Sequence, residues 1–335
     1  MGSTAFQQTM IAAALDIGTN TLLMAIADLS PDALLGGNPQ NVSGQVAPFF
    51  SHSLIRKVIA DEHRIARLGE GVDRSQWICQ AAIERASAII REYRSIADAA
   101  GATARIAVGT SVFRAARNGA EVARILGMLW GAPVEVLSGQ EEAELCYRGT
   151  VYHRERAAVL DIGGGSTELT IGEHSRILAR NSIELGAVRL AERFWRSYPA
   201  PQEALNAAWQ LAVETLAPFA ELPAVERMYA VAGTPTTLAL MAQDLQHNNW
   251  QRAEGYILKR TAIERLWQQL AAASLEELRS IPSVHPQRAD ILPAGVLLLR
   301  AAIDVLGVDA AIVSTRGLRY GAFWRLVERH EKFCR

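Results

Sequence analysis

Two short acidic turns hold the residues with the clearest chemical potential in this chain. The first reads Asp-Ile-Gly-Thr-Asn-Thr at 16–21, and the second reads Asp-Ile-Gly-Gly-Gly-Ser-Thr-Glu at 161–168. Each turn stands between two apolar runs, so each is predicted to join two strands. The same acidic turn is therefore used once in each half of the chain, which indicates that both copies serve one site.

The second turn has the composition of a phosphate-binding loop. Three successive glycines permit positive φ and leave backbone N–H groups uncovered, and a concave run of such donors binds anions, typically phosphate. A plain hairpin turn, the alternative, does not need three glycines, and Asp161 and Glu168 would be unusual in a core. The candidate phosphate ligands in this turn are Gly163, Gly164, Gly165, Ser166 and Thr167.

Four better-known motifs do not fit the second turn. The chain contains no Gly-Lys dipeptide, which excludes a P-loop, and no His-Glu-x-x-His zinc motif. A dinucleotide-binding fingerprint would need glycine at position 168 and a helix after it, whereas the residues that follow alternate like a strand. A nucleophile elbow would need glycine two positions after Ser166, where Glu168 stands.

The first turn is the weaker copy. Gly18 allows a tight turn, and taken alone the segment is a β-turn with turn-favouring residues. Beside the second turn, it is predicted to form the opposite jaw of a phosphate clamp. Asp16 and Asp161 would then face each other and repel a phosphate unless a cation such as Mg²⁺ lies between them. The candidate phosphate ligands here are Gly18, Thr19, Asn20 and Thr21.

The elements that position these turns alternate between strand and helix in both halves. Besides the strands around each turn, strands are predicted at 49–59, 104–109, 133–138, 181–186, 227–233 and 310–315, and helices at 75–102, 139–152, 202–220, 260–280 and 289–306. Such alternation is typical of α/β layers. We expect two α/β domains, at 1–132 and 133–316, with a last helix near 317–335 that is a candidate to pack back on the first domain.

Composition excludes several classes of protein. A formal net charge of −1 over 335 residues gives no field for nucleic acid or for an acidic membrane. The three cysteines are widely spaced, which argues against a disulfide framework or a zinc site and fits a reducing compartment. No apolar run approaches the length needed to span a bilayer. We expect a cytoplasmic protein without a nucleic-acid or membrane partner, and the sequence leaves a homodimer open.

The two turns and the alternation around them resemble the actin, sugar-kinase and heat-shock ATPase superfamily. A finer resemblance is to the exopolyphosphatase and guanosine pentaphosphate phosphohydrolase family. It is carried in order by LDIGTNT (15–21), RLGEG (67–71), GTSVFRAARN (109–118), VEVLSGQEEAELCYRG (134–149), LDIGGGSTEL (160–169), ELGAVRL (184–190), VAGTPTTLA (231–239), ILPAG (291–295) and STRGLRYG (314–321). The resemblance implies two actin-like (ribonuclease H-like) domains, each with a mixed central sheet flanked by helices, and a cleft between them.

The resemblance also implies roles for individual residues. Glu142 matches the catalytic base that positions the attacking water, and Glu168 matches a second catalytic glutamate near the metal and the water. Asp16, Asp161 and Glu168 then form the candidate metal site for Mg²⁺ or another divalent cation. Arg114 matches an arginine that contacts phosphate.

Glu142 and Arg114 each keep an alternative from the residues themselves, which for Arg114 is that of a solvated arginine on a helix. Glu141, Glu142 and Glu144 are also ordinary residues of a helix N-terminus, where the helix dipole favours carboxylates. Glu141 is the neighbour that could take the role of Glu142, because adjacent helical residues point about 100° apart and only one can face a cleft. Gly233 and Thr234 stand where a strand gives way to a helix, so helix N–H groups could add a third phosphate contact.

The expected activity is hydrolysis of a phosphoanhydride bond, with release of the terminal phosphate of inorganic polyphosphate by metal-assisted, in-line attack of water. Three alternatives stay open. Guanosine pentaphosphate presents the same terminal bond, an ATP-using phosphotransferase of the same superfamily would share the clamp, and a catalytically weak sensor would bind a phosphorylated nucleotide and close. Longer relatives carry a C-terminal helical domain of the HD type, and this chain resembles the short two-domain form.

Overall fold

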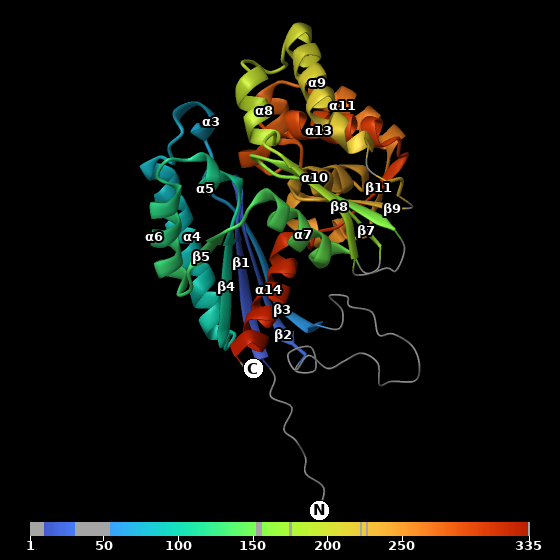
Figure 1. The fold of residues 1–335 in the computed structure, drawn as a ribbon. Helices are drawn as coiled ribbons and strands as arrows, with labels where there is room; N and C mark the ends of the chain where they lie inside the picture. Colours follow the sequence, from blue (N-terminus) through green and yellow to red (C-terminus); the bar gives the residue numbers. More distant parts are fainter. Residues whose placement is uncertain are drawn as a thin grey trace, which may run out of the picture.

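The structure of this chain is a computed structural model, which describes residues 10–30, 54–151, 156–173, 176–221, 223–225 and 227–333. These residues form two mixed sheets, each flanked by helices (Figure 1). The first five residues of the strand predicted at 49–59 lie outside the described ranges. Within those ranges, no helix combines the length and the apolar composition that a membrane span requires.

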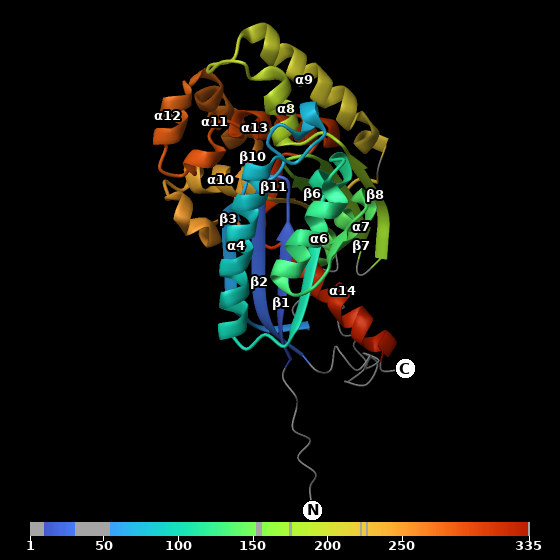
Figure 2. The ribbon, with the colours of Figure 1, turned by 90° about the vertical axis from the view of Figure 1, so that its left-hand side faces the viewer.

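The first sheet has the strand order β3-β2-β1-β4-β5. Its strands are β1 (Met10–Ile17), β2 (Thr21–Leu29), β3 (Ile55–Ile65), β4 (Ala104–Gly109) and β5 (Val134–Val136). β1 pairs antiparallel with β2 and parallel with β4. Because side chains alternate across a strand, Leu15 and Ile17 pack toward α4 (Gln80–Ala99) and α6 (Gly119–Trp130), which lie in front of this sheet in Figure 2.

The second sheet repeats this order with one additional strand, as β10-β11-β9-β6-β7-β8. Its strands are β6 (Ala157–Ile162), β7 (Thr167–Glu173), β8 (Arg176–Ile183), β9 (Arg227–Val231), β10 (Ile257–Lys259) and β11 (Ala310–Val313). β6 pairs antiparallel with β7 and parallel with β9, as β1 does with β2 and β4. The first halves of the two domains are therefore built on one plan.

Helices of the second domain cover one face of its sheet and form the largest core of the described residues with it (Figure 1). They are α8 (Ala187–Phe194), α9 (Gln202–Leu216), α10 (Gly233–Ala242), α11 (Arg260–Ala272), α12 (Leu275–Ser280) and α13 (Leu292–Leu306). In the first domain, the short helices α3 (Val72–Ser75) and α5 (Ser111–Ala115) lie at the end of the sheet that faces the second domain (Figure 1).

Two helices lie where the domains meet. α7 (Gly139–Thr150) packs on β6, β7 and β8, and α14 (Leu318–Phe333) packs on β1 and β4. The two helices also pack against each other, so closely that a Cβ atom at Gly149 or Gly321 would overlap backbone of the facing segment. The chain thus enters the second domain through α7 and returns to the first sheet through α14 (Figure 1).

This topology confirms the predicted fold class of two actin-like, ribonuclease H-like domains with mixed sheets flanked by helices. In both sheets three antiparallel strands come first in the chain and parallel pairs follow the crossovers, and the second sheet ends with β10 antiparallel to β11. The division predicted at residue 132 would place β5 with the second domain. β5 instead pairs with β4, because its backbone continues the parallel edge of the first sheet.

Candidate active site

Both acidic turns line one cleft between the two domains. The cleft-lining residues of the turns are Asp16, Gly18, Thr19, Asn20 and Thr21 from the first, and Asp161, Ile162, Gly163, Gly164, Gly165 and Ser166 from the second. The turns are in contact, because a Cβ atom added at Gly165 would lie 2.9 Å from Thr19 Oγ1, closer than real Cβ contacts allow. The lack of a side chain at Gly165 is what lets the jaws approach each other.

Glu142 and Gly233 also line the cleft, whereas four other predicted site residues are not among its lining residues. The Thr167 hydroxyl points away from the cleft and donates to Leu185 O at 2.6 Å. Thr234 is buried, and its hydroxyl packs against Gly295 at the start of α13. These two hydroxyl groups support the loops rather than facing a ligand. Arg114 and Glu168, the remaining two, lie beside the cleft in contact with other site residues.

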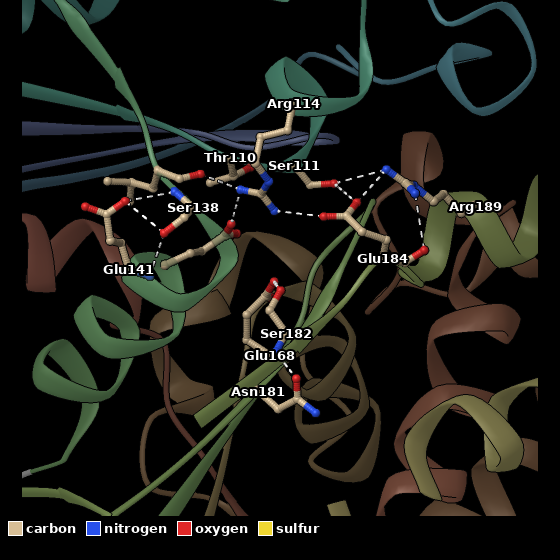
Figure 3. Close-up of polar contacts among 12 residues, drawn as sticks. Thr110, Ser111, Arg114, Ser138, Glu141, Glu168, Asn181, Ser182, Glu184 and Arg189 are labelled. Atoms are coloured by element: carbon tan, nitrogen blue, oxygen red, sulfur yellow. Dashed lines mark hydrogen bonds and ion pairs between the residues drawn. The ribbon is translucent and has the colours of Figure 1, made fainter. Parts of the chain in front are cut away.

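The geometry of α7 directs the side chains of Glu141 and Glu142 to different surroundings. Ser138 caps the helix: its side chain accepts from the Glu141 N–H, and the Glu141 carboxylate accepts from the Ser138 N–H at 3.0 Å (Figure 3). Glu141 also pairs with Arg325 of α14 at 2.6 Å. Glu141 is thereby held away from the cleft. The Glu142 side chain is 8% exposed and points into the cleft.

Arg114 is the direct partner of Glu142. Its Nη1 donates to Glu142 Oε2 at 2.9 Å and to Leu137 O at 2.7 Å. Burial raises the pKa of Glu142 to about 7; Arg114 opposes this shift, and the charges of Asp161 and Glu184 add to it. A carboxyl group with a pKa near neutrality is suited to accept a proton from water.

Three further carboxyl groups surround Glu142. Burial raises the pKa of Asp16 well above its usual range, and the charges of Glu142 and Asp161 raise it further. Burial raises the pKa of Asp161 to about 6, although the Cys146 thiol donates to its Oδ2 at 3.2 Å. The pKa of Glu168 is raised by burial and by the charges of Glu142 and Asp161. Such mutual repulsion is what a bound cation would relieve.

The carboxyl groups of the cleft supply some, but not all, of the ligands that a divalent cation requires. Asp16 Oδ1 and Glu168 Oε2 are buried without a hydrogen-bond partner, and unsatisfied buried carboxyl oxygens are unfavourable unless a ligand meets them. Across the described ranges, no three His, Cys, Asp or Glu side chains are gathered closely enough to hold a metal ion alone. Mg²⁺ is usually bound through one or two carboxylates together with water and substrate phosphates, which is compatible with this arrangement.

Arg288 is a cleft residue that the sequence patterns did not reveal. It is 9% exposed, its Nε has no hydrogen-bond partner, and its guanidinium lies directly against Gly233 at the N-terminus of α10. Burial lowers the pKa of Arg288 to about 10, while Asp290 opposes the shift. The sequence feature that could have pointed to Arg288 is its position, three residues before the family motif that begins at Ile291. A buried cation beside helix N–H groups is well suited to hold an anion.

Arg319 supplies a second buried guanidinium at the cleft. It forms a bidentate pair with Asp61 of β3, at 2.8 and 2.9 Å, and Tyr320 donates to the same carboxylate at 2.8 Å. The charge of Arg319 lowers the pKa of Asp16, against the larger effect of burial. Arg319 therefore moderates the concentration of negative charge in the cleft.

The sequence of this chain is similar to those of known proteins over most of its length. The model of the Ppx/GppA phosphatase family matches residues 50–330. Exopolyphosphatase 2 of Mycobacterium tuberculosis is 30% identical over 325 residues, covering 92% of this chain and 96% of that protein. Guanosine-5'-triphosphate,3'-diphosphate pyrophosphatase of Vibrio parahaemolyticus is 27% identical over 94% of this chain, which spans 59% of that protein.

Solved structures extend the similarity to three dimensions. An exopolyphosphatase from Cytophaga hutchinsonii superimposes with a TM-score of 0.79 at 26% identity, covering 96% of this chain and 98% of that one. A Ppx/GppA family member from Aquifex aeolicus shares the fold, with a TM-score of 0.74 at 24% identity over 96% of this chain and 99% of that one. Both similarities extend over the two domains.

Proposed function

Because the chain belongs to the Ppx/GppA phosphatase family, we propose that this enzyme, a phosphoanhydride hydrolase, releases the terminal phosphate of inorganic polyphosphate. The observation that carries the proposal is Glu142, a buried carboxylate in a cleft whose two walls are acidic, glycine-containing turns. A relative whose alignment covers 92% of this chain and 96% of its own length is named an exopolyphosphatase. We place the enzyme in the cytoplasm and expect neither nucleic acid nor membrane as a partner.

The residues divide the reaction between them. Backbone N–H groups and hydroxyls of 18–21 and 163–166 hold the terminal phosphate, with Arg114 and Arg288 as cationic contacts. A water oxygen bonds to phosphorus in line with the bridging oxygen, the bond from phosphorus to that oxygen breaks, and Glu142 takes the proton from water. The shortened chain leaves with the bridging oxygen. The cleft supplies charge stabilisation at fixed positions, which is the larger part of such catalysis.

A role for a divalent cation follows from the carboxyl groups. Asp16, Asp161 and Glu168 would hold Mg²⁺ or another divalent ion, whose charge, when bound, offsets that of the phosphoryl oxygens. The unpartnered oxygens of Asp16 and Glu168 support this assignment.

Guanosine pentaphosphate is the second candidate substrate. It presents a terminal phosphoanhydride to the same jaws, and a relative that matches 94% of the chain is named for cleavage of that nucleotide. That relative is longer, since this chain spans 59% of it. Polyphosphate is therefore the first choice here, because the relative that is named an exopolyphosphatase is covered over 96% of its own length.

The test is phosphate release from tripolyphosphate, long-chain polyphosphate and guanosine pentaphosphate, measured side by side with Mg²⁺ and without a phosphate acceptor. The proposal expects free phosphate, fastest from a polyphosphate. Faster release from the nucleotide would move the assignment to the second candidate. Release from none of the three by a correctly folded protein would refute hydrolysis.

A further inference from the structure

Three donors converge on one carboxylate next to the catalytic cleft (Figure 3). The carboxylate belongs to Glu184, which lies between β8 and α8. It accepts from Ser111 Oγ at 3.1 Å, from Arg114 Nη2 at 3.2 Å and from Arg189 Nη2 at 2.7 Å. A hydroxyl and two guanidinium groups directed at two oxygens form the kind of donor set that recognises a phosphate.

The three donor side chains are more deeply buried than the carboxylate that they bind. Ser111 is buried, and the side chains of Arg114 and Arg189 are 22% and 15% exposed. The Glu184 side chain is 49% exposed. The donor set is therefore built into the protein, whereas the carboxylate can leave it toward solvent. The set also joins both domains, since Ser111 and Arg114 lie on α5 and Arg189 lies on α8.

The donor set continues directly from the phosphate loop. A Cβ atom at Gly165 would lie 2.6 Å from Ser111 Oγ, so the loop backbone rests on this hydroxyl. A small cavity runs along the same side, with Thr19, Gly165, Ser111 and Arg189 among its lining residues. A phosphate next in line to one held by the two jaws would therefore approach these donors.

We propose that Glu184 is an intramolecular competitor, whose carboxylate occupies an anion site formed by Ser111, Arg114 and Arg189 until a phosphate of the substrate displaces it. The inference rests on the proposed function and adds a subsite to it. Within the Arg114 guanidinium, only Nη2 exchanges partners, because Nη1 stays on Glu142 and Leu137 O. The catalytic base thus keeps its partner while the same guanidinium takes hold of the substrate.

Competition of this kind lowers the apparent affinity for phosphate chains. The apparent dissociation constant rises as the fraction of protein with an open site falls. If Glu184 occupies the site in about nine tenths of the free protein, the Glu184→Gln variant binds about tenfold more tightly. The amide keeps the size of the side chain but has lost the charge that attracts both arginines.

The experiment is a calorimetric titration with imidodiphosphate, a pyrophosphate analogue that resists hydrolysis, in the presence of Mg²⁺. Glu184→Gln is compared with wild type and with Glu144→Gln. Glu144 pairs with Arg148 and Arg180 and not with Arg114, so this control removes the same charge and also an arginine partner. We expect about tenfold tighter binding for Glu184→Gln and little change for Glu144→Gln.

Arg189→Gln provides the opposite test, because loss of a donor should weaken binding about tenfold. Glu184→Asp, which keeps the charge on a shorter side chain, is the second variant and should fall between wild type and Glu184→Gln. Unchanged or weaker binding by Glu184→Gln, or an equal gain in Glu144→Gln, overturns the proposal. Because the probe is not a substrate, absence of hydrolysis by the wild type would count against the proposed function and leave this titration valid.

Discussion

Replacing Glu142 by glutamine is expected to lower kcat by about 10² to 10⁴ and to leave the fold intact. The amide oxygen can still accept the hydrogen bond that Arg114 Nη1 makes at 2.9 Å, so the buried guanidinium keeps a partner. The amide cannot take a proton from water. A loss of this size corresponds to about 3 to 5 kcal/mol of activation free energy.

The pH dependence of kcat gives an independent measure of the same role. Burial raises the pKa of Glu142 to about 7, against the opposing charge of Arg114. Only the deprotonated form accepts a proton, so the wild-type rate should rise with pH through this pKa. The base form increases from about one tenth at pH 6 to about nine tenths at pH 8. The Glu142→Gln variant should show no such rise over the same range.

The assay is phosphate release from tripolyphosphate at saturating Mg²⁺, with Glu141→Gln as the matched control. Glu141 is the adjacent glutamate, but it belongs to the capping box at Ser138 and to the pair with Arg325. Its replacement should cost about 1 kcal/mol of unfolding free energy and change kcat by less than about threefold. Circular dichroism would confirm that both variants are folded.

Three results would refute the reasoning. A Glu142→Gln variant with the wild-type rate would show that this carboxylate is not the base. An equal loss of kcat in Glu141→Gln would show that the first turn of α7 does not assign the catalytic role to Glu142 alone. A wild-type profile that stays flat between about pH 6 and pH 8 would contradict the raised pKa as the source of catalysis.

Three further outcomes are expected. Arg288→Gln should raise the KM for tripolyphosphate about tenfold or more, because it removes a buried cation beside the α10 N-terminus; an unchanged KM would contradict this contact. Gly321→Ala should lower the unfolding free energy by about 2 to 4 kcal/mol in a urea titration, since the added Cβ overlaps Leu145 O of α7; wild-type stability would argue against that packing. In the presence of a chelator, the melting temperature should fall as pH rises from about 4.5 toward about 7. The raised pKa of Glu142 means that the folded state binds the carboxyl proton more tightly than the unfolded state, so stability is lost as that proton dissociates. A melting temperature that rises over this range would refute the reasoning.

The local structure around the site could be predicted because its signals are local. Alternating apolar runs around Asp16 and Asp161 predicted two strand–turn–strand units, and these are β1–β2 and β6–β7. Successive glycines at 163–165 predicted a turn with uncovered backbone N–H groups, and in the structure Gly164 and Gly165 of this turn lie against the Thr19 side chain. The Ser-x-x-Glu pattern at 138–141 is a capping-box signal, so the sequence also contained the information that assigns Glu141 to the helix cap.

Other parts of the site depend on segments far apart in the chain. Arg288 meets Gly233 because the turn at 286–288, just before α13, lies against the N-terminus of α10, and no spacing near residue 288 indicates this contact. Glu184 meets Arg114 because the ends of β8 and α5 face each other across the domain interface. The sequence likewise gave no sign of where the Thr167 and Thr234 hydroxyls point, and packing directs both away from the cleft. The predicted phosphate contact of Thr234 depends on its helix N–H group and stays a prediction.

The sequence by itself determined the two domains, the paired acidic turns and the family, since these follow from periodicity and from short motifs that act within a few residues. Only the tertiary structure decided which arginines reach the cleft and in which direction the pKa values of its carboxyl groups shift. The physical reason is that burial and the surrounding charges set these properties. Both arise when the domains close the cleft and bring Asp16, Glu142, Asp161 and Glu168 out of water together.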